Sequence, residues 1–285
     1  MARSGSADGD GMRLDGTQQD DAGLDRLNRD GSGFRLRGEQ VTRLETFVDA
    51  AVAFSLTLLV IFTNDLPASA TELREAMKKV PTFIACFAVL MMFWAAHNRW
   101  SRRFGLEDAR STLLSLVFVL VVMIYVYPLR MVASSFLSLL TAGWLPNELG
   151  FDGGDIMRDL QTAFIVYSLG FGLLSWVLWR LNVQGLRHAD ALRLDDNERH
   201  LAATEAGMNA ILVGVSLLAL VFALALYVAD PSLPGAWRLL GGAPMWCYAT
   251  LGVWMPLFHA RRERQRLALL DATRTVRGAD AGTAA

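Results

Sequence analysis

The chain has 285 residues, of which 53% are hydrophobic and only 19% are charged. Soluble domains carry about 25% charged residues, so this composition excludes an ordinary soluble domain and indicates an integral membrane protein. The formal net charge of −1 argues against a nucleic-acid-binding protein, because such proteins present a strongly basic surface.

The N-terminal region, residues 1–38, is rich in Gly, Asp, Ser and Arg and contains no apolar run. It lacks the apolar core of a signal peptide, so we expect no cleavage. A glycine-rich segment of mixed charge buries too little surface to become ordered. We therefore expect a disordered tail over residues 1–38, a transmembrane domain over residues 39–265 and a C-terminal cytoplasmic tail over residues 266–285.

Six long apolar segments follow the tail, and each is close to the roughly 20 residues that a helix needs to cross a bilayer. Their apolar runs are continuous rather than alternating, which argues against a β-barrel. The predicted fold is an all-α integral membrane protein with six transmembrane helices. The segments span residues 44–63, 80–99, 111–129, 160–180, 206–228 and 239–258.

The arginines and lysines near the segment ends predict how the protein is oriented. Six successive crossings place fifteen arginines on one side of the membrane and six basic residues on the other. Loops rich in Lys and Arg stay in the cytoplasm. We therefore expect a multi-pass protein of the cell membrane, surrounded by lipid, with both termini cytoplasmic.

Motifs for catalysis or for cofactor binding are absent from the sequence. It contains no phosphate-binding P-loop, no dinucleotide-binding glycine motif, no HExxH and no CxxC, and these are the patterns that position phosphates and metals. We therefore expect no enzymatic activity, no cofactor and no metal site.

Asp49 is the polar residue that most needs an explanation, because a carboxylate at the margin of a membrane helix is costly unless it is paired or functional. Arg43 lies about 240° around the helix from Asp49 and does not share its face. The second segment runs antiparallel and ends at the same level with His97 and Asn98. We expect both to donate hydrogen bonds to Asp49, with Arg43 or Arg99 neutralising its charge. This network either fixes the two helices together or couples them to protons.

The first segment also has an apolar face. Phe54, Leu58 and Ile61 fall within about 40° of one another, Thr57 lies about 60° to one side, and Asp49 lies about 140° from Phe54. Such a stripe is usually core packing. Around a symmetry axis, it would form a ring of apolar side chains that gates a pore by dewetting.

Two stretches resemble a known family. The first segment begins with RLETFVD (residues 43–49), which resembles the R-x-x-x-F-S-D signature on the first helix of the transmembrane protein 175 family, the lysosomal-endosomal potassium channel and its prokaryotic relatives. The second segment ends with FWAAHNR (residues 93–99), which resembles that family's aromatic-x-x-His segment. Six spans with cytoplasmic termini are similar to the single-repeat prokaryotic form.

The resemblance implies a homotetrameric, potassium-permeable cation channel whose first helix lines the pore. No cofactor other than the permeant potassium ion is implied, and no TVGYG filter is present, as in the family. The residues that the resemblance assigns to a structural network are Arg43, Phe47, Asp49 and His97. The residues that it assigns to the pore are Phe54 at the apolar constriction, Leu58 and Ile61 in the next rings, and Thr57 in a threonine layer.

Two departures from the family pattern affect these expectations. Val48 replaces the signature serine and removes a hydroxyl from the network, and Phe54 is bulkier than the usual Leu or Ile. Two other functions stay open: a proton-linked secondary transporter that uses Asp49 and His97, and a non-conducting membrane scaffold. The two halves of the chain show no matching pair of broken helices, which many transporters have.

Overall fold

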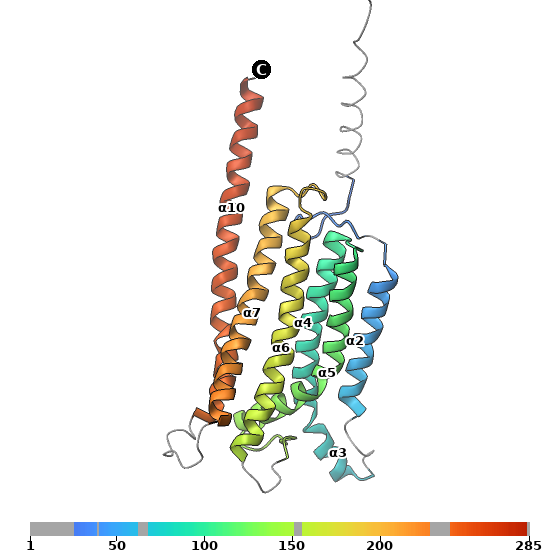
Figure 1. Ribbon diagram of the computed structural model, residues 1–285, viewed down its shortest axis with the longest axis vertical. Coiled ribbons are helices and arrows are strands. Elements are labelled where there is room, and N and C mark those ends of the chain that lie inside the picture. The colour runs from blue at the N-terminus through green and yellow to red at the C-terminus, as the bar shows by residue number, and fades with distance from the viewer. Residues whose placement is uncertain (1–25, 39, 62–67, 151–155, 229–239, 284–285) are drawn as a thin grey trace, which may run out of the picture.

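The computed structural model describes residues 26–38, 40–61, 68–150, 156–228 and 240–283, and these form a bundle of long helices (Figure 1). Apart from an isolated antiparallel bridge between Arg29 and Arg35, the described secondary structure is helical. The helices are α2 (Arg43–Ile61), α3 (Ala70–Met77), α4 (Val80–Phe104), α5 (Ala109–Leu140), α6 (Ile156–Arg187), α7 (Asp196–Val228), η1 (Leu240–Gly242), α9 (Ala243–Ala249) and α10 (Leu251–Thr283).

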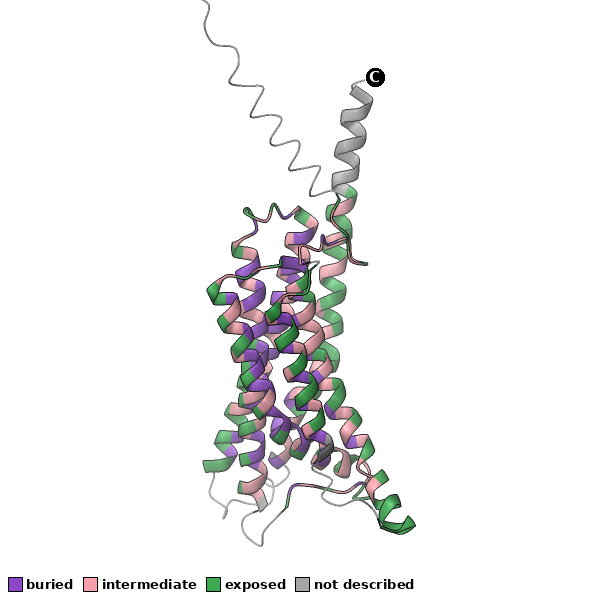
Figure 2. Ribbon diagram, turned by 90° about the vertical axis from the view of Figure 1, so that its right-hand side faces the viewer, coloured by how far each residue is buried: buried purple, intermediate pink, exposed green. Residues whose placement is uncertain are grey.

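The bundle is arranged so that α2 lies at one edge and α10 at the other (Figure 1). α2 packs against α4 and α5, α6 packs against α5 and α7, and α9 and α10 pack against α7. Buried residues, drawn in purple, are found along the length of the bundle (Figure 2). The candidate pore helix therefore has neighbours on one side only within the subunit.

The apolar segments of the sequence coincide with helices, as predicted. Among the described residues, four helical stretches are long and apolar enough to cross a membrane. α2 also lies in the bundle but carries three charged residues near its start. The four stretches are Ala70–Phe104, Ala109–Leu140, Met157–Arg187 and Asp196–Val228.

Two predicted segments differ in detail from the structure. The third was predicted to end near residue 129, but α5 continues to Leu140 and contains Pro128. The sixth was predicted as one span, but it divides into η1, α9 and α10, with a break at Thr250. The Thr250 hydroxyl donates to the carbonyl of Cys247 at 2.6 Å, which satisfies an acceptor at the end of α9. α10 then extends past the other helices at one end of the bundle (Figure 1).

The turn between α4 and α5 shows how the sequence fixes the end of the bundle where α2 begins. α4 ends at Phe104 and is followed by Gly105, which has a φ of 57°, a left-handed conformation that glycine adopts without strain. Asp108 then caps α5 by accepting a hydrogen bond from the backbone N–H of Arg110, which supplies one of the unpaired helix-start donors with an acceptor.

The N-terminal prediction needs correction within the described residues. Residues 26–38 were expected to be disordered, but they pack on the bundle and bury Phe34 completely. Their order comes from distant partners described below, which the local composition does not reveal. Residues 1–25 lie outside the described part of the chain.

The arginine-rich helix ends gather at one end of the bundle. α2 and α5 begin there, α4 and α6 end there, and α10 also ends there (Figure 1). The arrangement agrees with the alternating crossings expected from the sequence.

Candidate functional site

α2 has a buried face that is set by the spacing of its small and aliphatic side chains. Val48, Val52, Ser55 and Leu59 are all buried against neighbouring helices. Their spacing of three or four residues places them on one side of a helix. Val48, which stands at the signature serine position, is therefore a packing residue in this chain.

The opposite face of α2 is exposed in the subunit. The exposed fractions of Phe47 and Phe54 are both 51%, Thr57 is also exposed, and Leu58 is half-buried. The side chain of Ile61 lies outside the described part, so its predicted position stays untested. The helix thus separates into a packed face and an open face that includes Phe54 and Thr57.

Thr57 offers an oxygen on the open face. Its hydroxyl donates to the backbone carbonyl of Phe54 at 2.7 Å. A hydroxyl has one donor and two acceptor lone pairs. No donor contacts this hydroxyl in the part of the chain that the structure describes, so its lone pairs can accept bonds there.

Asp49 has a different partner from the one predicted. The indole Nε1 of Trp94 donates to the Asp49 Oδ1 at 2.7 Å, and Trp94 belongs to α4, the helix that was expected to supply the partner. Neither His97 nor Asn98 bonds to Asp49 in the described part of the chain, and Arg43 is exposed without an ion pair to it.

His97 takes part in a separate buried contact. Its Nε2 lies 3.0 Å from the Ser115 hydroxyl of α5, and its ring stacks on Phe118 with the centroids 4.9 Å apart. The His97 side chain therefore joins α4 to α5 and does not contact α2 through Asp49. The hydrogen bond from His97 to Asp49 that the sequence predicted is therefore not formed, and that prediction was wrong.

An N-terminal strap (residues 28–37), which sequence reasoning missed, crosses the end of the bundle where α2 begins (Figure 1). Phe34 is its buried anchor, and its ring meets Phe104 of α4 edge-on with centroids 5.6 Å apart. The Arg103 guanidinium lies 4.9 Å from the centre of the Phe34 ring, a distance at which cation–π attraction operates.

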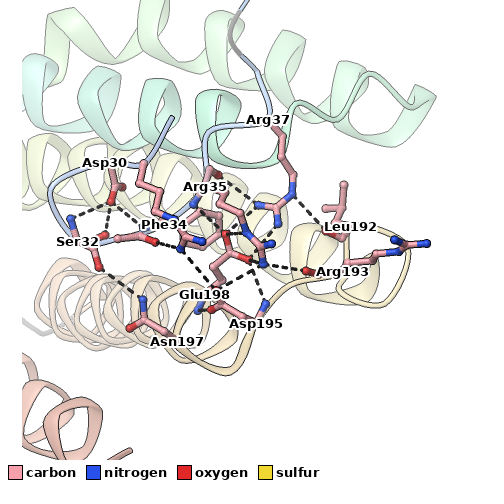
Figure 3. Close-up of polar contacts among 12 residues, drawn as sticks. Asp30, Ser32, Phe34, Arg35, Arg37, Leu192, Arg193, Asp195, Asn197 and Glu198 are labelled. Carbon is pink, nitrogen blue, oxygen red and sulfur yellow. Dashed lines mark hydrogen bonds and ion pairs between the residues drawn. The ribbon is translucent and has the colours of Figure 1, made fainter. Parts of the chain in front are cut away.

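Glu198, near the start of α7, is the centre of the contacts that the strap makes (Figure 3). Its fully buried side chain accepts hydrogen bonds from the backbone N–H of Arg35 at 2.8 Å and from Arg35 Nη2 at 2.9 Å. Arg37 Nη2 donates at 3.0 Å and the Asp195 backbone N–H also at 3.0 Å. A buried carboxylate is tolerated only when it is paired and hydrogen-bonded in this way.

The strap also joins α4 and α10. Arg103 of α4 donates to Asp30 at 2.9 Å and to Glu205 of α7 at 3.2 Å. Arg266 of α10 donates to the Ser32 carbonyl. The strap therefore ties three helices together six residues before α2 begins.

Asp30 is ionised under ordinary conditions. Burial alone would raise its pKa, but hydrogen bonds from Ser32 and Arg103 and the positive charge of Arg103 hold the pKa below its ordinary value. A carboxyl group with a lowered pKa in the folded state adds stability above its unfolded pKa and loses it as the pH falls through the folded pKa. The Asp30 contacts therefore stabilise the strap at neutral pH, and this stabilisation is lost in acid.

No group of three or more His, Cys, Asp or Glu side chains is placed to hold a metal ion among the residues that the structure describes. The chemistry available at α2 consists of aromatic and aliphatic surface, a hydroxyl layer and a braced carboxylate.

Comparisons with known proteins show which proteins the chain is similar to. The sequence model of the family described as "Endosomal/lysosomal potassium channel TMEM175" matches residues 43–128, which include α2, α4 and most of α5. A potassium channel from Marivirga tractuosa is 30% identical over 199 residues, covering 67% of this chain and 78% of that protein. A crystallised variant of the potassium channel MtTMEM175, in complex with a nanobody–MBP fusion, has a TM-score of 0.67 and 26% identity. That match covers 82% of this chain and 100% of the solved chain.

The substitution Glu198→Ala should destabilise the protein strongly, because it removes the buried carboxylate that pairs with both Arg35 and Arg37 and leaves Arg35 the more distant and more exposed carboxylate of Asp195. Breaking a buried pair in this way costs about 3–5 kcal/mol. The melting temperature of detergent-purified protein measures the loss. Asp190→Ala is the control, because it removes the ion pair between Asp190 and Arg199, in which the Asp190 side chain is 96% exposed. Equal losses for the two variants would contradict the role of Glu198.

The substitution Trp94→Phe should destabilise the contact between α2 and α4. It keeps an aromatic ring, although a smaller one, but leaves the Asp49 carboxylate without its indole donor, at a cost of about 1–3 kcal/mol. Thermal unfolding in detergent again measures this cost. Trp254→Phe on α10, where the side chain is 58% exposed, should leave the melting temperature unchanged. A Trp94→Phe variant as stable as the control would rule out this brace.

Proposed function

The chain belongs to the TMEM175 family of potassium channels, and from this premise we propose that it forms a homotetrameric, potassium-permeable pore lined by α2. A channel of this family is a membrane protein without an enzymatic role. Four copies around one axis would bring their α2 helices together. We place the tetramer in the cell membrane with both termini cytoplasmic, on the support of the arginine-rich helix ends.

The observation that carries this proposal is the exposed face of α2. Phe54 is half-exposed on a helix whose other face is packed on α4 and α5. One subunit cannot enclose a path for ions with a single helix face. Repeating that face around an axis would convert the exposed aromatic and hydroxyl side chains into successive rings.

The rings would act on the ion by controlling water. An apolar constriction at Phe54 excludes water and sets an energetic barrier to a hydrated ion. The hydroxyl of Thr57 lies about 4.5 Å further along the helix axis, and its free lone pairs can replace part of the lost hydration. Leu58 and Ile61 continue the apolar path beyond this layer. Potassium would thus cross a short dry segment with an oxygen layer beside it.

Asp49 acts as a structural brace in this proposal and not as an ion site. Its carboxylate is engaged by Trp94, and its position on the helix is well removed from Phe54. The proton-linked transporter considered from the sequence needs a direct link between Asp49 and His97, whereas His97 bonds to Ser115. No other contact in the described part of the chain favours that mechanism.

The test is potassium flux into liposomes that contain the purified protein. The substitution Phe54→Ala should raise the flux about tenfold, which corresponds to a barrier lowered by about 1.4 kcal/mol, because it opens the constriction. Phe222→Ala on α7 is the matched control, since Phe222 is also partly exposed, at 43%, but lies on a helix away from α2. Background flux from both the wild type and Phe54→Ala would exclude a channel and favour a membrane scaffold.

A further inference from the structure

A buried arginine contacts the far end of α2. Arg130 directly follows the predicted third segment, residues 111–129, but it lies inside α5 and is only 9% exposed. Its Nη1 donates to the backbone carbonyl of Leu59 at 3.0 Å. The contact joins α5 to the last turn of the candidate pore helix.

The chemistry of a helix end explains why a cation lies there. The carbonyl of Leu59 lies in the last turn of α2, which is described to Ile61, and carbonyls in the last turn of a helix commonly bond to groups outside the helix. The C-terminal end of a helix also carries a partial negative charge that attracts a cation. One N–H group of Arg130 therefore gives the carbonyl a donor and places a positive charge at this end of the helix.

Glu148 holds the guanidinium in place. This residue belongs to the connection between α5 and α6, and its carboxylate accepts two bonds from Arg130, one from Nε and one from Nη2, the latter at 2.7 Å. The backbone N–H of Glu148 donates to the hydroxyl of Ser134 on α5 at 3.1 Å. A two-point arginine–carboxylate pair fixes direction as well as charge, so Nη1 is aimed at the Leu59 carbonyl.

We propose that Arg130 and Glu148 are positioning residues for ion permeation. They fix the height and the rotation of the outer half of α2, and therefore the spacing of the Thr57 and Leu58 side chains around the pore. Leu59 follows Thr57 by only two residues, about 3 Å along the helix axis. The inference rests on the proposed function, because it assigns to the pair an effect on an α2-lined pore.

The ratio of potassium flux to sodium flux in liposomes tests the proposal. This ratio does not depend on the fraction of protein that is folded, so a purely structural role leaves it unchanged. Arg130→Met removes the contact, and Glu148→Gln keeps an acceptor for Arg130 while it frees the guanidinium to turn. Both should move the ratio toward one, because ion discrimination depends on how coordinating oxygens are arranged.

A conservative variant and a matched control sharpen the experiment. Arg130→Lys keeps the charge but cannot bond Glu148 and Leu59 together as the guanidinium fork does, so its ratio should lie between those of the wild type and Arg130→Met. Arg74→Met removes an exposed arginine of α3 and should leave the ratio unchanged.

The outcomes separate the two proposals. Background potassium flux from both the wild type and Phe54→Ala overturns the proposed function and this inference with it. If only Phe54→Ala conducts, the flux ratio is measured with the Phe54→Ala substitution present in every variant. A wild type that conducts, with the same ratio in Arg130→Met and Glu148→Gln, overturns the inference alone. If Arg130→Met fails to fold, the Glu148→Gln variant and the lysine variant still decide the question.

Discussion

The packing of one face of α2 against α4 and α5 is the constraint on which the candidate site depends. Val48, Val52 and Leu59 occupy that face, and the helical repeat then leaves Phe54 and Thr57 on the open side. Between helices in a membrane there is no hydrophobic driving force, because lipid tails are as apolar as the side chains. Close fit and polar contacts must therefore hold the helix in place.

Polar contacts are found at three levels along this part of the chain. The strap is fixed by Glu198 shortly before α2 begins, Trp94 bonds to Asp49 in the first half of the helix, and Arg130 bonds to the Leu59 carbonyl in the last turn. The contacts come from three different helices, α7, α4 and α5. The position of α2 therefore depends on the assembly of the whole bundle, and it cannot be set by one neighbour.

The sequence predicted well those features that arise from local periodicity. Apolar run length identified the long helices, and the helical repeat separated Asp49 from the face of Phe54. The sequence analysis also predicted the correct neighbouring helix for Asp49 but the wrong residue. Acid–base chemistry suggested His97, whereas the indole N–H of Trp94 makes the bond. Trp94 and His97 are three positions apart and differ by about 60° around α4, which is enough to direct one toward α2 and the other toward Ser115 on α5.

The strap and the contact between Arg130 and the Leu59 carbonyl could not be predicted in the same way. Arg35 is 163 residues from Glu198, and a glycine-rich, charged composition gives no sign that Phe34 will be buried. Arg130 looked like a loop arginine because the apolar run ends near it, whereas the helix continues for ten more residues to Leu140. In both cases a charged side chain finds its partner only when the chain folds, so the local sequence does not predict its position.

The spacing of the two contacts on α2 has a consequence for the proposed gate. Asp49 and Leu59 are ten residues apart, about 15 Å along the helix, and Phe54 lies midway between them. A helix that is held on both sides of its centre by hydrogen bonds resists tilting there, since a tilt large enough to widen a pore would break one of them. A constriction at Phe54 would therefore open most readily by rotation of its side chain, which is half-exposed in the subunit. In the proposed tetramer, the four Phe54 rings would move between staggered positions while the contacts of Asp49 and Leu59 stay intact.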